Sequence, residues 1–329
     1  MTKDIELICR LNRNWRPGNI KVKRAGGQTN RNYIVQYKNK KFFVRLPWES
    51  DVIDRKIEGK NILALSKNKR LREILPWYYV YILNKKNILD SKNQKIFNLL
   101  NDGTMMTEYI EGKLFSPILF KKRQYQEKLA KMFYIFHKSR VSLVNDYSVF
   151  RDELAKYRRA VEKRGVPKFI NEKTILNLKK IEIEAKKRTL LLKKGVPTHN
   201  DFIFQNFLVG KNGKLYLLDF EYAGMNRKGG CLYDFAFLFA DNVFRQPAMN
   251  KKLFEQFLKT ADKIYGQRLD RGQIYWLALA VPVMQVWWGL LRYFDVKTKK
   301  EKEYFKDYVL KRAKGVEFLY KLISKKSEG

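Results

Sequence analysis

The chain has 329 residues, of which 45% are hydrophobic and 14% aromatic, so it is long enough for two domains or one two-lobed unit with a well-packed core. Two distant cysteines, Cys9 and Cys231, argue against a disulfide framework, and with only two histidines they leave almost no ligands for a zinc site. The formal net charge of +36 comes from basic residues spread along the chain without a base-reading motif, which argues against a specific nucleic-acid partner and leaves weak attraction to anionic surfaces.

The first third of the chain predicts a small antiparallel sheet with two helices. It begins with residues of mixed charge and no apolar core, so we expect no signal peptide and a cytoplasmic protein. Short apolar and aromatic runs separated by turn residues are typical of strands joined by tight connections. The expected elements are helices at 3–13 and 52–66 and strands at 20–24, 32–37, 41–46, 77–83, 96–100 and 104–109.

The chain after residue 112 is mostly helical in its pattern, because apolar residues recur there at helical spacing. The predicted helices are 116–137, 150–164, 169–188, 231–241, 251–265, 271–293 and 300–323. Within the sixth of them, residues 274–291 carry no charge, which reaches the lower limit for a membrane span. Pro282, Gln285 and Gly289 lie inside this stretch and favour a buried core helix. We therefore expect no transmembrane segment.

A β-hairpin is predicted within the helical part. The apolar runs 206–209 and 215–218 are joined by Lys211-Asn212-Gly213-Lys214, whose Asn-Gly pair is a strong signal for a tight turn. The stretch His199 to Asn206, which reads HNDxxxxN, precedes the hairpin, and Asp219-Phe220-Glu221 follows it. The hairpin is therefore expected to bring Asp201 and Asp219 toward the same end.

The acids and the amide at the ends of this hairpin match the needs of phosphoryl transfer. In that reaction the protein mainly supplies position and charge compensation, with an aspartate near the acceptor hydroxyl and oxygen ligands for the metal. Asp201 suits the first task, and Asn206 and Asp219 offer the hard oxygen ligands that Mg²⁺ prefers. Either acid alone also fits a helix cap or a strand end, but the whole pattern favours the catalytic interpretation.

HNDxxxxN followed by DFEYAG at 219–224 resembles the motif pair of the choline/ethanolamine kinase family, within the wider aminoglycoside-phosphotransferase-like and protein-kinase-like group. Three other segments are similar to family motifs, namely GGQTN at 26–30, FFVRLP at 42–47 and IDRKIE at 53–58. The resemblance implies an α+β, two-lobed, protein-kinase-like fold. Its parts would be a small N-terminal nucleotide-binding lobe with an antiparallel sheet (1–109) and a larger, mostly helical catalytic and acceptor-binding lobe (110–329).

ATP and Mg²⁺ are the cofactors that the resemblance implies, with Asp201 as the catalytic residue. The implied metal ligands are Asn206, Asp219 and Glu221. The implied nucleotide-binding residues are Gly27, Gln28, Thr29, Asn30, Arg45, Glu58, Glu108 and Ile110, the last two through backbone atoms at a hinge.

Two of these nucleotide-site assignments also have a physical reason. A Gly-Gly pair lets backbone amides approach a phosphate closely, although it is also common in an ordinary hairpin turn. Arg45 is the one cation in the apolar run 42–47 and is costly to bury without a partner. Glu58 on the next helix is the natural partner, and the pair would hold the arginine toward the phosphates; a surface arginine is the alternative.

The partner that the resemblance implies is a small amino alcohol, with choline as the first choice. The implied acceptor-binding residues are Asp234, Asp241, Trp288 and Tyr308. Trp288 corresponds to the first tryptophan of the family's WGLW stretch and Leu291 replaces the second, which weakens an aromatic cage for a quaternary ammonium. Helical aromatics are also common in plain cores. His137 is similar to a histidine at a helix end of the family, where we expect a structural role.

Two alternatives remain open at this point. One keeps the enzyme and changes the acceptor to ethanolamine, thiamine or an aminoglycoside. The other is a catalytically silent kinase-like domain that binds a membrane or a partner through its basic surface. The presence of Asp201, Asn206 and Asp219 together argues against the silent domain.

Overall fold

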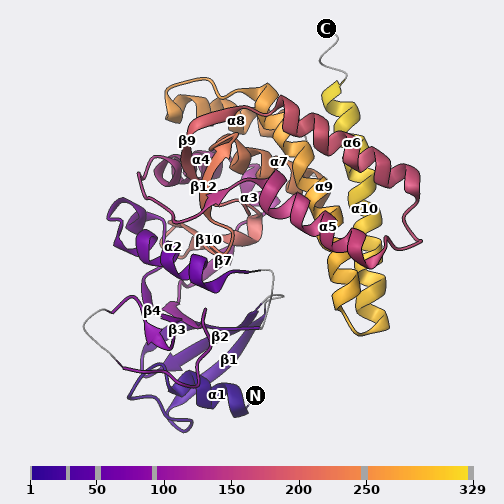
Figure 1. The fold of residues 1–329 in the computed structure, drawn as a ribbon. Helices are drawn as coiled ribbons and strands as arrows, with labels where there is room; N and C mark the ends of the chain where they lie inside the picture. The colour runs from indigo at the N-terminus through magenta and orange to yellow at the C-terminus, as the bar shows by residue number, and fades with distance from the viewer. Residues whose placement is uncertain (1, 27–29, 49–52, 91–94, 246–250, 325–329) are drawn as a thin grey trace. The chain divides into compact units, whose positions relative to one another are not determined.

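The computed structural model describes residues 2–26, 30–48, 53–90, 95–245 and 251–324. The chain forms two compact units, each drawn from several segments (Figure 1). Unit 1 consists of residues 1–115, 138–145 and 205–223. Unit 2 consists of residues 116–137, 146–204 and 224–329. The structure is mixed α+β, with an antiparallel sheet in unit 1 and mostly helices in unit 2, as predicted.

Unit 1 is built on a six-stranded antiparallel sheet with the strand order β1-β2-β3-β6-β4-β5. Its strands are β1 (Ile20–Gly26), β2 (Asn30–Tyr37), β3 (Lys40–Pro47), β4 (Tyr78–Leu83), β5 (Lys86–Asn87) and β6 (Met105–Glu108). Alternate side chains such as Tyr33 and Val35 point into the core. The strand predicted at 96–100 is wrong. Ile96 forms only an isolated bridge, and Phe97 and Leu100 reach the core from a turn.

The described part of unit 1 also contains two α-helices and a second small sheet. Helix α1 (Thr2–Cys9) is shorter than predicted, and α2 (Arg55–Lys67) is followed by the 3₁₀ turn η1 (Arg70–Glu73). Asp54 caps α2 by accepting hydrogen bonds from the backbone N–H groups of residues 56 and 57. The second sheet has the order β11-β10-β7, from β7 (Gly112–Leu114), β10 (Phe207–Gly210) and β11 (Leu215–Leu217). Strands β10 and β11 pair antiparallel, which confirms the predicted hairpin.

Unit 2 is mainly helical, as predicted. Its helices are α3 (Pro117–Phe120), α4 (Arg123–His137), the π-helical turn η2 (Val149–Leu154), α5 (Ala155–Arg164), α6 (Glu172–Arg188), α7 (Leu232–Arg245), α8 (Lys251–Tyr265), α9 (Arg271–Asp295) and α10 (Lys299–Ser324). Helix α9 packs against α5, α6, α7 and α10, and it runs beside α10 in Figure 1. The single helix predicted at 116–137 is divided into α3 and α4, with Ser116 capping the first of them.

A three-stranded sheet in unit 2 has no counterpart among the predicted strands. It has the order β8-β12-β9, from β8 (Asp146–Tyr147), β9 (Leu191–Thr198) and β12 (Gly224–Lys228). The 3₁₀ turn η3 (Phe204–Asn206) follows β9 in the chain. Gly195 and Pro197 lie inside β9, and residues of this type weaken a strand signal in sequence. The pairing of β9 with β12 therefore depends on partners that are distant in the chain.

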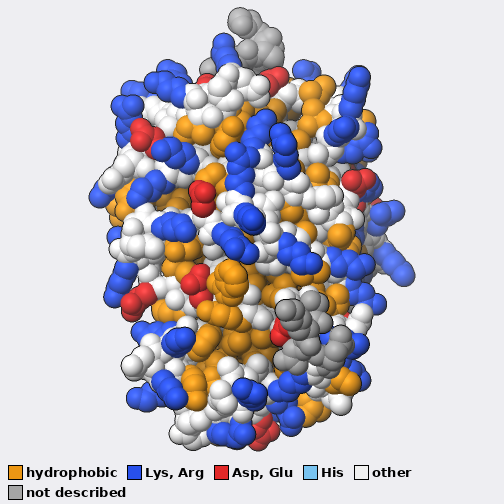
Figure 2. Space-filling model, turned by 90° about the vertical axis from the view of Figure 1, so that its left-hand side faces the viewer, with side chains coloured by type: hydrophobic (Ala, Val, Ile, Leu, Met, Phe, Trp, Pro, Cys, Tyr) orange, Lys and Arg blue, Asp and Glu red, His pale blue; other side chains and the backbone are white. Residues whose placement is uncertain are grey.

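Helix α9 contains the uncharged segment 274–291, whose length reaches the lower limit for a membrane span. Of the described residues, only this helix is long and apolar enough to cross a membrane, and 89% of its most apolar window is buried. Trp287 and Leu290 in this helix have no exposed surface. This burial is that of a core helix, as predicted. The face drawn in Figure 2 carries scattered Lys and Arg side chains with few acids between them, in agreement with the spread of basic residues along the chain.

Candidate active site

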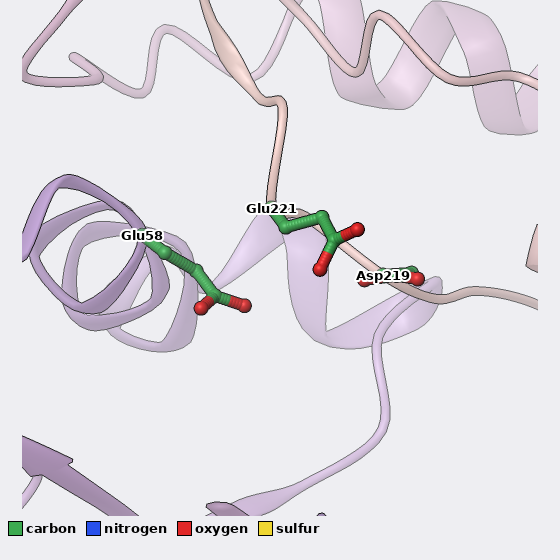
Figure 3. Close-up of side chains that lie close together, drawn as sticks. All are labelled: Glu58, Asp219 and Glu221. Atoms are coloured by element: carbon green, nitrogen blue, oxygen red, sulfur yellow. The ribbon is translucent and has the colours of Figure 1, made fainter. Parts of the chain in front are cut away.

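Three carboxylates of unit 1 form a cluster, which we call the acidic cluster: Glu58, Asp219 and Glu221. Glu58 comes from helix α2, and the other two follow strand β11 (Figure 3). Each offers an oxygen, and these oxygens all lie within 4.8 Å of one another. Asp219 has the left-handed backbone conformation, with φ of 63°, which is uncommon for a residue other than glycine. Such a conformation is typical of a position where the chain turns sharply to aim a side chain.

Asn206 is held at the same end of the hairpin as the acidic cluster. It directly precedes strand β10, and its carbonyl accepts a hydrogen bond of 2.9 Å from the backbone N–H of Leu218. Leu218 is the residue before Asp219, so the bond ties the two ends of the hairpin together. The hairpin therefore brings Asn206 next to the segment of Asp219 and Glu221, whereas Asp201 belongs to unit 2 and its approach to Asp219 stays a prediction.

Two arginines compensate the charge of the acidic cluster. Arg45 forms an ion pair of 2.6 Å with Glu58, as predicted, and both side chains are almost fully buried. Arg45 also donates two hydrogen bonds, of 3.2 and 3.3 Å, to the carbonyl of Gly103. Burial lowers the pKa of the Arg45 guanidinium, but the charge and the hydrogen bond of Glu58, together with Tyr81 and Asp219, outweigh burial and the net pKa is raised. Arg45 is therefore a permanent buried cation next to the acidic cluster.

Arg55 is a residue of this site to which the sequence interpretation gave no role. Its guanidinium bridges Glu58 at 2.8 Å, Glu221 at 3.5 Å and the side-chain oxygen of Asn30 at 2.8 Å. It thus connects the acidic cluster to Asn30, the first residue of β2 and the last residue of the GGQTN segment. The signal was present in the sequence, because Arg55 stands three residues before Glu58 and would share its helix face.

The pKa shifts of the three carboxylates differ in direction. Burial raises the pKa of Glu58, but Arg45 and Arg55 outweigh burial and the net pKa is lowered. Burial raises the pKa of Asp219; the charges of Arg45 and Arg55 oppose this rise without cancelling it, and the charge of Glu58 adds to it. Burial also raises the pKa of Glu221 well above its ordinary value, with Asp219 and Glu58 adding to it. Ionising Asp219 and Glu221 side by side is costly, because burial disfavours each negative charge and the two like charges repel. A divalent cation bound between them would offset this cost.

The other predicted nucleotide-binding residues are only partly described. Gly27, Gln28 and Thr29 lie outside the described residues. The backbone N–H of Glu108 donates to the carbonyl of Trp77, and the Glu108 carboxylate accepts from the N–H of Trp77, so this residue is held on both sides. Ile110 follows two residues later, before strand β7. Their contacts with adenine stay a prediction.

Asp201 belongs to unit 2, where the loop before it is held by a buried carboxylate. Asp234 on helix α7 accepts hydrogen bonds from the backbone N–H groups of His199 at 3.0 Å and Asn200 at 2.8 Å. Asn200 has φ of 68°, again the left-handed conformation. The N–H of Asp201 donates to Nδ1 of His199 at 3.3 Å. Asp234 therefore fixes the backbone that presents Asp201.

Asp234 is itself fixed by a histidine at the end of helix α4. Nε2 of His137 lies 2.8 Å from Oδ2 of Asp234, and Nδ1 of His137 lies 2.6 Å from the hydroxyl of Tyr265. Asp234 has no exposed surface, and His137 is 4% exposed. These contacts favour a positioning role for Asp234, whereas its predicted contact with the acceptor stays untested. The structural role expected for His137 agrees with them.

A second buried acid of unit 2 was missed by the sequence interpretation. Glu153 accepts a short hydrogen bond from the hydroxyl of Tyr147, which lies 3.4 Å from the hydroxyl of Tyr233. Burial raises the pKa of Glu153 to about 8; the hydrogen bond from Tyr147 opposes this rise and the charge of Asp201 adds to it. A protonated acid thus lies within the electrostatic reach of Asp201. No motif in the sequence marks it.

The remaining predicted acceptor residues form a group in unit 2. The ring of Trp288 lies 5.6 Å from that of Tyr308 and 5.7 Å from that of Phe305, all on helices α9 and α10. Asp241 on helix α7 is 1% exposed and accepts hydrogen bonds from Gln285 and Arg312. Arg312 in turn lies 5.1 Å from the centre of the Tyr308 ring. Asp241, Trp288 and Tyr308 are therefore connected through one group of contacts.

The choline/ethanolamine kinase family model matches residues 22–259. No curated protein matches the chain by sequence. Choline kinase LicA from Streptococcus pneumoniae is 20% identical, with a TM-score of 0.67 over 90% of this chain and 92% of that one. LicA in complex with AMP is 20% identical, with a TM-score of 0.69 over 96% and 99%. Ethanolamine kinase from Plasmodium vivax is 17% identical, with a TM-score of 0.68 over 94% and 87%.

A spectinomycin phosphotransferase in complex with ADP and spectinomycin is also similar, at 14% identity and a TM-score of 0.57 over 92% and 93% of the two chains. At these identities the structural likeness establishes the kinase-like fold, which confirms the predicted fold class. The family and the fold together make the protein a phosphotransferase enzyme. Because the family model spans well over half of its residues, the chain belongs to the choline/ethanolamine kinase family.

Proposed function

We propose that the protein transfers a phosphoryl group from ATP to the hydroxyl of a small amino alcohol, with choline as the first candidate acceptor. The observation that carries the proposal is the acidic cluster of unit 1, with its two arginines, in a chain of this family. The solved structures of similar proteins with AMP and ADP support ATP as the donor. Phosphoryl transfer needs this combination of metal-binding oxygens and fixed cations.

Mg²⁺ fits the oxygen-bearing side chains at the end of the hairpin. Asp219 and Asn206 would hold the ion, and Glu221 would support it directly or through its waters, since Mg²⁺ is usually bound by one or two carboxylates plus waters and phosphates. The bound ion would supply positive charge that neutralises the phosphate oxygens. Glu58 is not proposed as a ligand, because Arg45 and Arg55 already engage its carboxylate. Arg45 and the segment 27–30 are proposed to hold phosphates.

Asp201 is the proposed partner of the acceptor hydroxyl. The loop that carries it is fixed by Asp234, so its carboxylate can hold a constant position while it orients the hydroxyl and accepts its proton. Asp201→Asn keeps the shape of the side chain and removes its negative charge. We expect the variant to fold normally and to lose turnover by about a thousandfold or more. Turnover at the wild-type level in this variant would remove Asp201 from the mechanism.

Asp241, Trp288 and Tyr308 are the proposed acceptor site. Aromatic faces attract a cation that has no hydrogen-bond donors, and a buried carboxylate supplies a counter-ion. The ring contacts between Trp288 and Tyr308 and their connection to Asp241 through Arg312 support this grouping. Phe305 adds a third aromatic ring beside Trp288. These side chains would bind the ammonium end of the acceptor.

The test is a substrate screen with ATP and magnesium in which phosphorylated products are detected by mass. The panel contains choline, ethanolamine, thiamine and an aminoglycoside. Saturable phosphorylation of choline supports the proposal in full, and phosphorylation of ethanolamine alone keeps the amino alcohol and replaces choline. A product only from thiamine or the aminoglycoside overturns the acceptor class. No nucleotide turnover with any amine would favour the silent binding domain.

A further inference from the structure

The carboxylate of Asp241 already has a cation beside it. Nη2 of Arg312 lies 3.4 Å from Oδ1 of Asp241, and Nε2 of Gln285 donates to the same oxygen at 3.1 Å. All three side chains are at most 5% exposed. The amide of Gln285 is oriented by the carboxylate, because only its nitrogen can donate. Asp241 is therefore neutralised by Arg312 before any ligand arrives.

Arg312 also occupies the aromatic part of the proposed acceptor site. Its guanidinium carbon lies 5.1 Å from the centre of the Tyr308 ring, within the range of a cation–π contact. The ring of Trp288 lies 5.6 Å from that of Tyr308. Arg312 thus makes the two contacts that an acceptor ammonium would need, one with a carboxylate and one with an aromatic ring.

We propose that Arg312 is a specificity-determining residue that competes with the cation of the acceptor for Asp241 and Tyr308. The inference rests on the proposed function, because it assumes that these two residues bind an amine. In the absence of acceptor, the arginine and the aspartate form a neutral buried pair. An arriving ammonium must share Asp241 with Arg312, and like charges placed side by side repel each other. The arginine therefore weakens the preference of the site for cations over neutral molecules of the same shape.

The test compares an amine with its carbon isostere. Choline is paired with 3,3-dimethylbutan-1-ol, in which carbon replaces the charged nitrogen; if ethanolamine is the acceptor, it is paired with propan-1-ol. The measured quantity is the cation preference, defined as KM of the isostere divided by KM of the amine. Because like-charge contacts cost several kcal/mol, Arg312→Met should raise the cation preference by about tenfold or more. An unchanged or lower cation preference would overturn the proposal.

Arg292 offers a matched control. It is also an arginine on this aromatic group, with its guanidinium 5.8 Å from the centre of the Phe305 ring, but its ion pair is with Asp295 at 3.9 Å. Arg292→Met removes the same charge from the same helix pair without freeing Asp241. We expect its cation preference to equal that of the wild type. An equal rise in both variants would point to general surface charge and overturn the specific role of Arg312.

A second comparison is needed if Arg312→Met fails to fold because the buried carboxylate of Asp241 then has no arginine beside it. Asp241→Asn leaves the arginine in the site without its counter-ion, so the arginine should repel the amine. The double variant Asp241→Asn with Arg312→Met carries neither charge. We expect the double variant to have a KM for the amine about tenfold lower than that of Asp241→Asn alone. An equal or higher KM in the double variant would overturn the proposal.

Trp288→Ala separates this inference from the proposed function. If the acceptor site is assigned correctly, this variant raises KM of the amine and leaves KM of ATP unchanged. If Trp288→Ala gives this result and Arg312→Met leaves the cation preference unaltered, the proposed role of Arg312 is wrong and the acceptor site stands. If Trp288→Ala leaves KM of the amine unchanged, the acceptor site itself is wrong and the role of Arg312 falls with it.

Discussion

Asp234 and His137 form a buried pair in which Oδ2 of the aspartate lies 2.8 Å from Nε2 of the histidine. The same carboxylate accepts the backbone N–H groups of His199 and Asn200, directly before Asp201. Helix α4, helix α7 and the loop of Asp201 are thus connected through one carboxylate. A carboxylate that accepts several N–H groups in a buried position is a rigid support, because moving it would leave those donors without partners.

The first prediction concerns this support. Asp234→Ala removes the acceptor of two buried backbone N–H groups, so we expect kcat to fall by about a hundredfold or more while KM of ATP changes little. Asp262→Ala is the control, because Asp262 also accepts a backbone N–H, from Leu269, and pairs with Arg271 outside the proposed site. Steady-state kinetics of the two variants decide the matter. An equal loss of kcat in both variants would contradict the positioning role of Asp234 and show that it contributes only to stability.

The second prediction concerns the ion pair between Arg45 and Glu58. Removing one partner of a buried pair leaves an uncompensated charge, so Glu58→Gln should destabilise the folded protein by roughly 3–5 kcal/mol. The control is the exposed Glu111, which lies 3.5 Å from Lys41 and 3.1 Å from Lys211, and Glu111→Gln should lower the free energy of unfolding far less than Glu58→Gln. Thermal unfolding followed by circular dichroism measures both. Equal shifts of Tm would show that burial of the first pair does not matter.

The third prediction concerns the buried acid Glu153. Its pKa is raised from the ordinary value of 4.5 to about 8, chiefly by burial. Between these values the unfolded chain releases the proton and the folded chain keeps it, so stability falls as pH rises through this window. The charged groups that act on Glu153 are Asp201, Asp152 and Lys156.

Glu153→Gln removes this titration. The free energy of unfolding of the variant minus that of the wild type should therefore be larger at pH 8 than at pH 5. Unfolding curves at the two pH values measure this difference. The exposed Glu303 on helix α10 provides the control variant Glu303→Gln, which changes the formal charge equally. A difference between Glu153→Gln and the wild type that is the same at both pH values would contradict the assigned titration.

The fourth prediction concerns the metal. If Asp219 binds Mg²⁺ directly, Asp219→Asn should lower kcat by about a thousandfold and raise the magnesium concentration for half-maximal activity. If Glu221 acts through waters, Glu221→Gln should cost about 10–100-fold in metal affinity. Titration with MgCl₂ at saturating ATP gives both values. EDTA removes divalent cations, and monovalent salt is then added back alone. If both variants remain active under these conditions, the proposed metal site is contradicted.

The sequence predicted much of the site because its signals are local. The Asn-Gly turn fixes the hairpin, and the hairpin alone brings Asn206 to the end that carries Asp219 and Glu221. Arg45 and Glu58 were paired correctly because a buried cation in an apolar strand needs an anion, and the next helix offered one. Strands with clear alternation were found, whereas 96–100 was misread, because an apolar run predicts burial and does not distinguish a strand from a buried turn.

Only the tertiary structure decided which residues far apart in the chain become partners. The contacts of Asp234 with His137 and the 199–200 backbone, of Arg55 with Glu221, and of Arg312 with Asp241 join segments separated by dozens of residues or more. Charge and spacing show that such residues need partners. They do not show which of the 69 basic or 33 acidic side chains is nearest, because that depends on how the helices and sheets pack. The sequence by itself determined the family motifs and the local elements. The tertiary packing determined which distant residues contact the side chains of the proposed site.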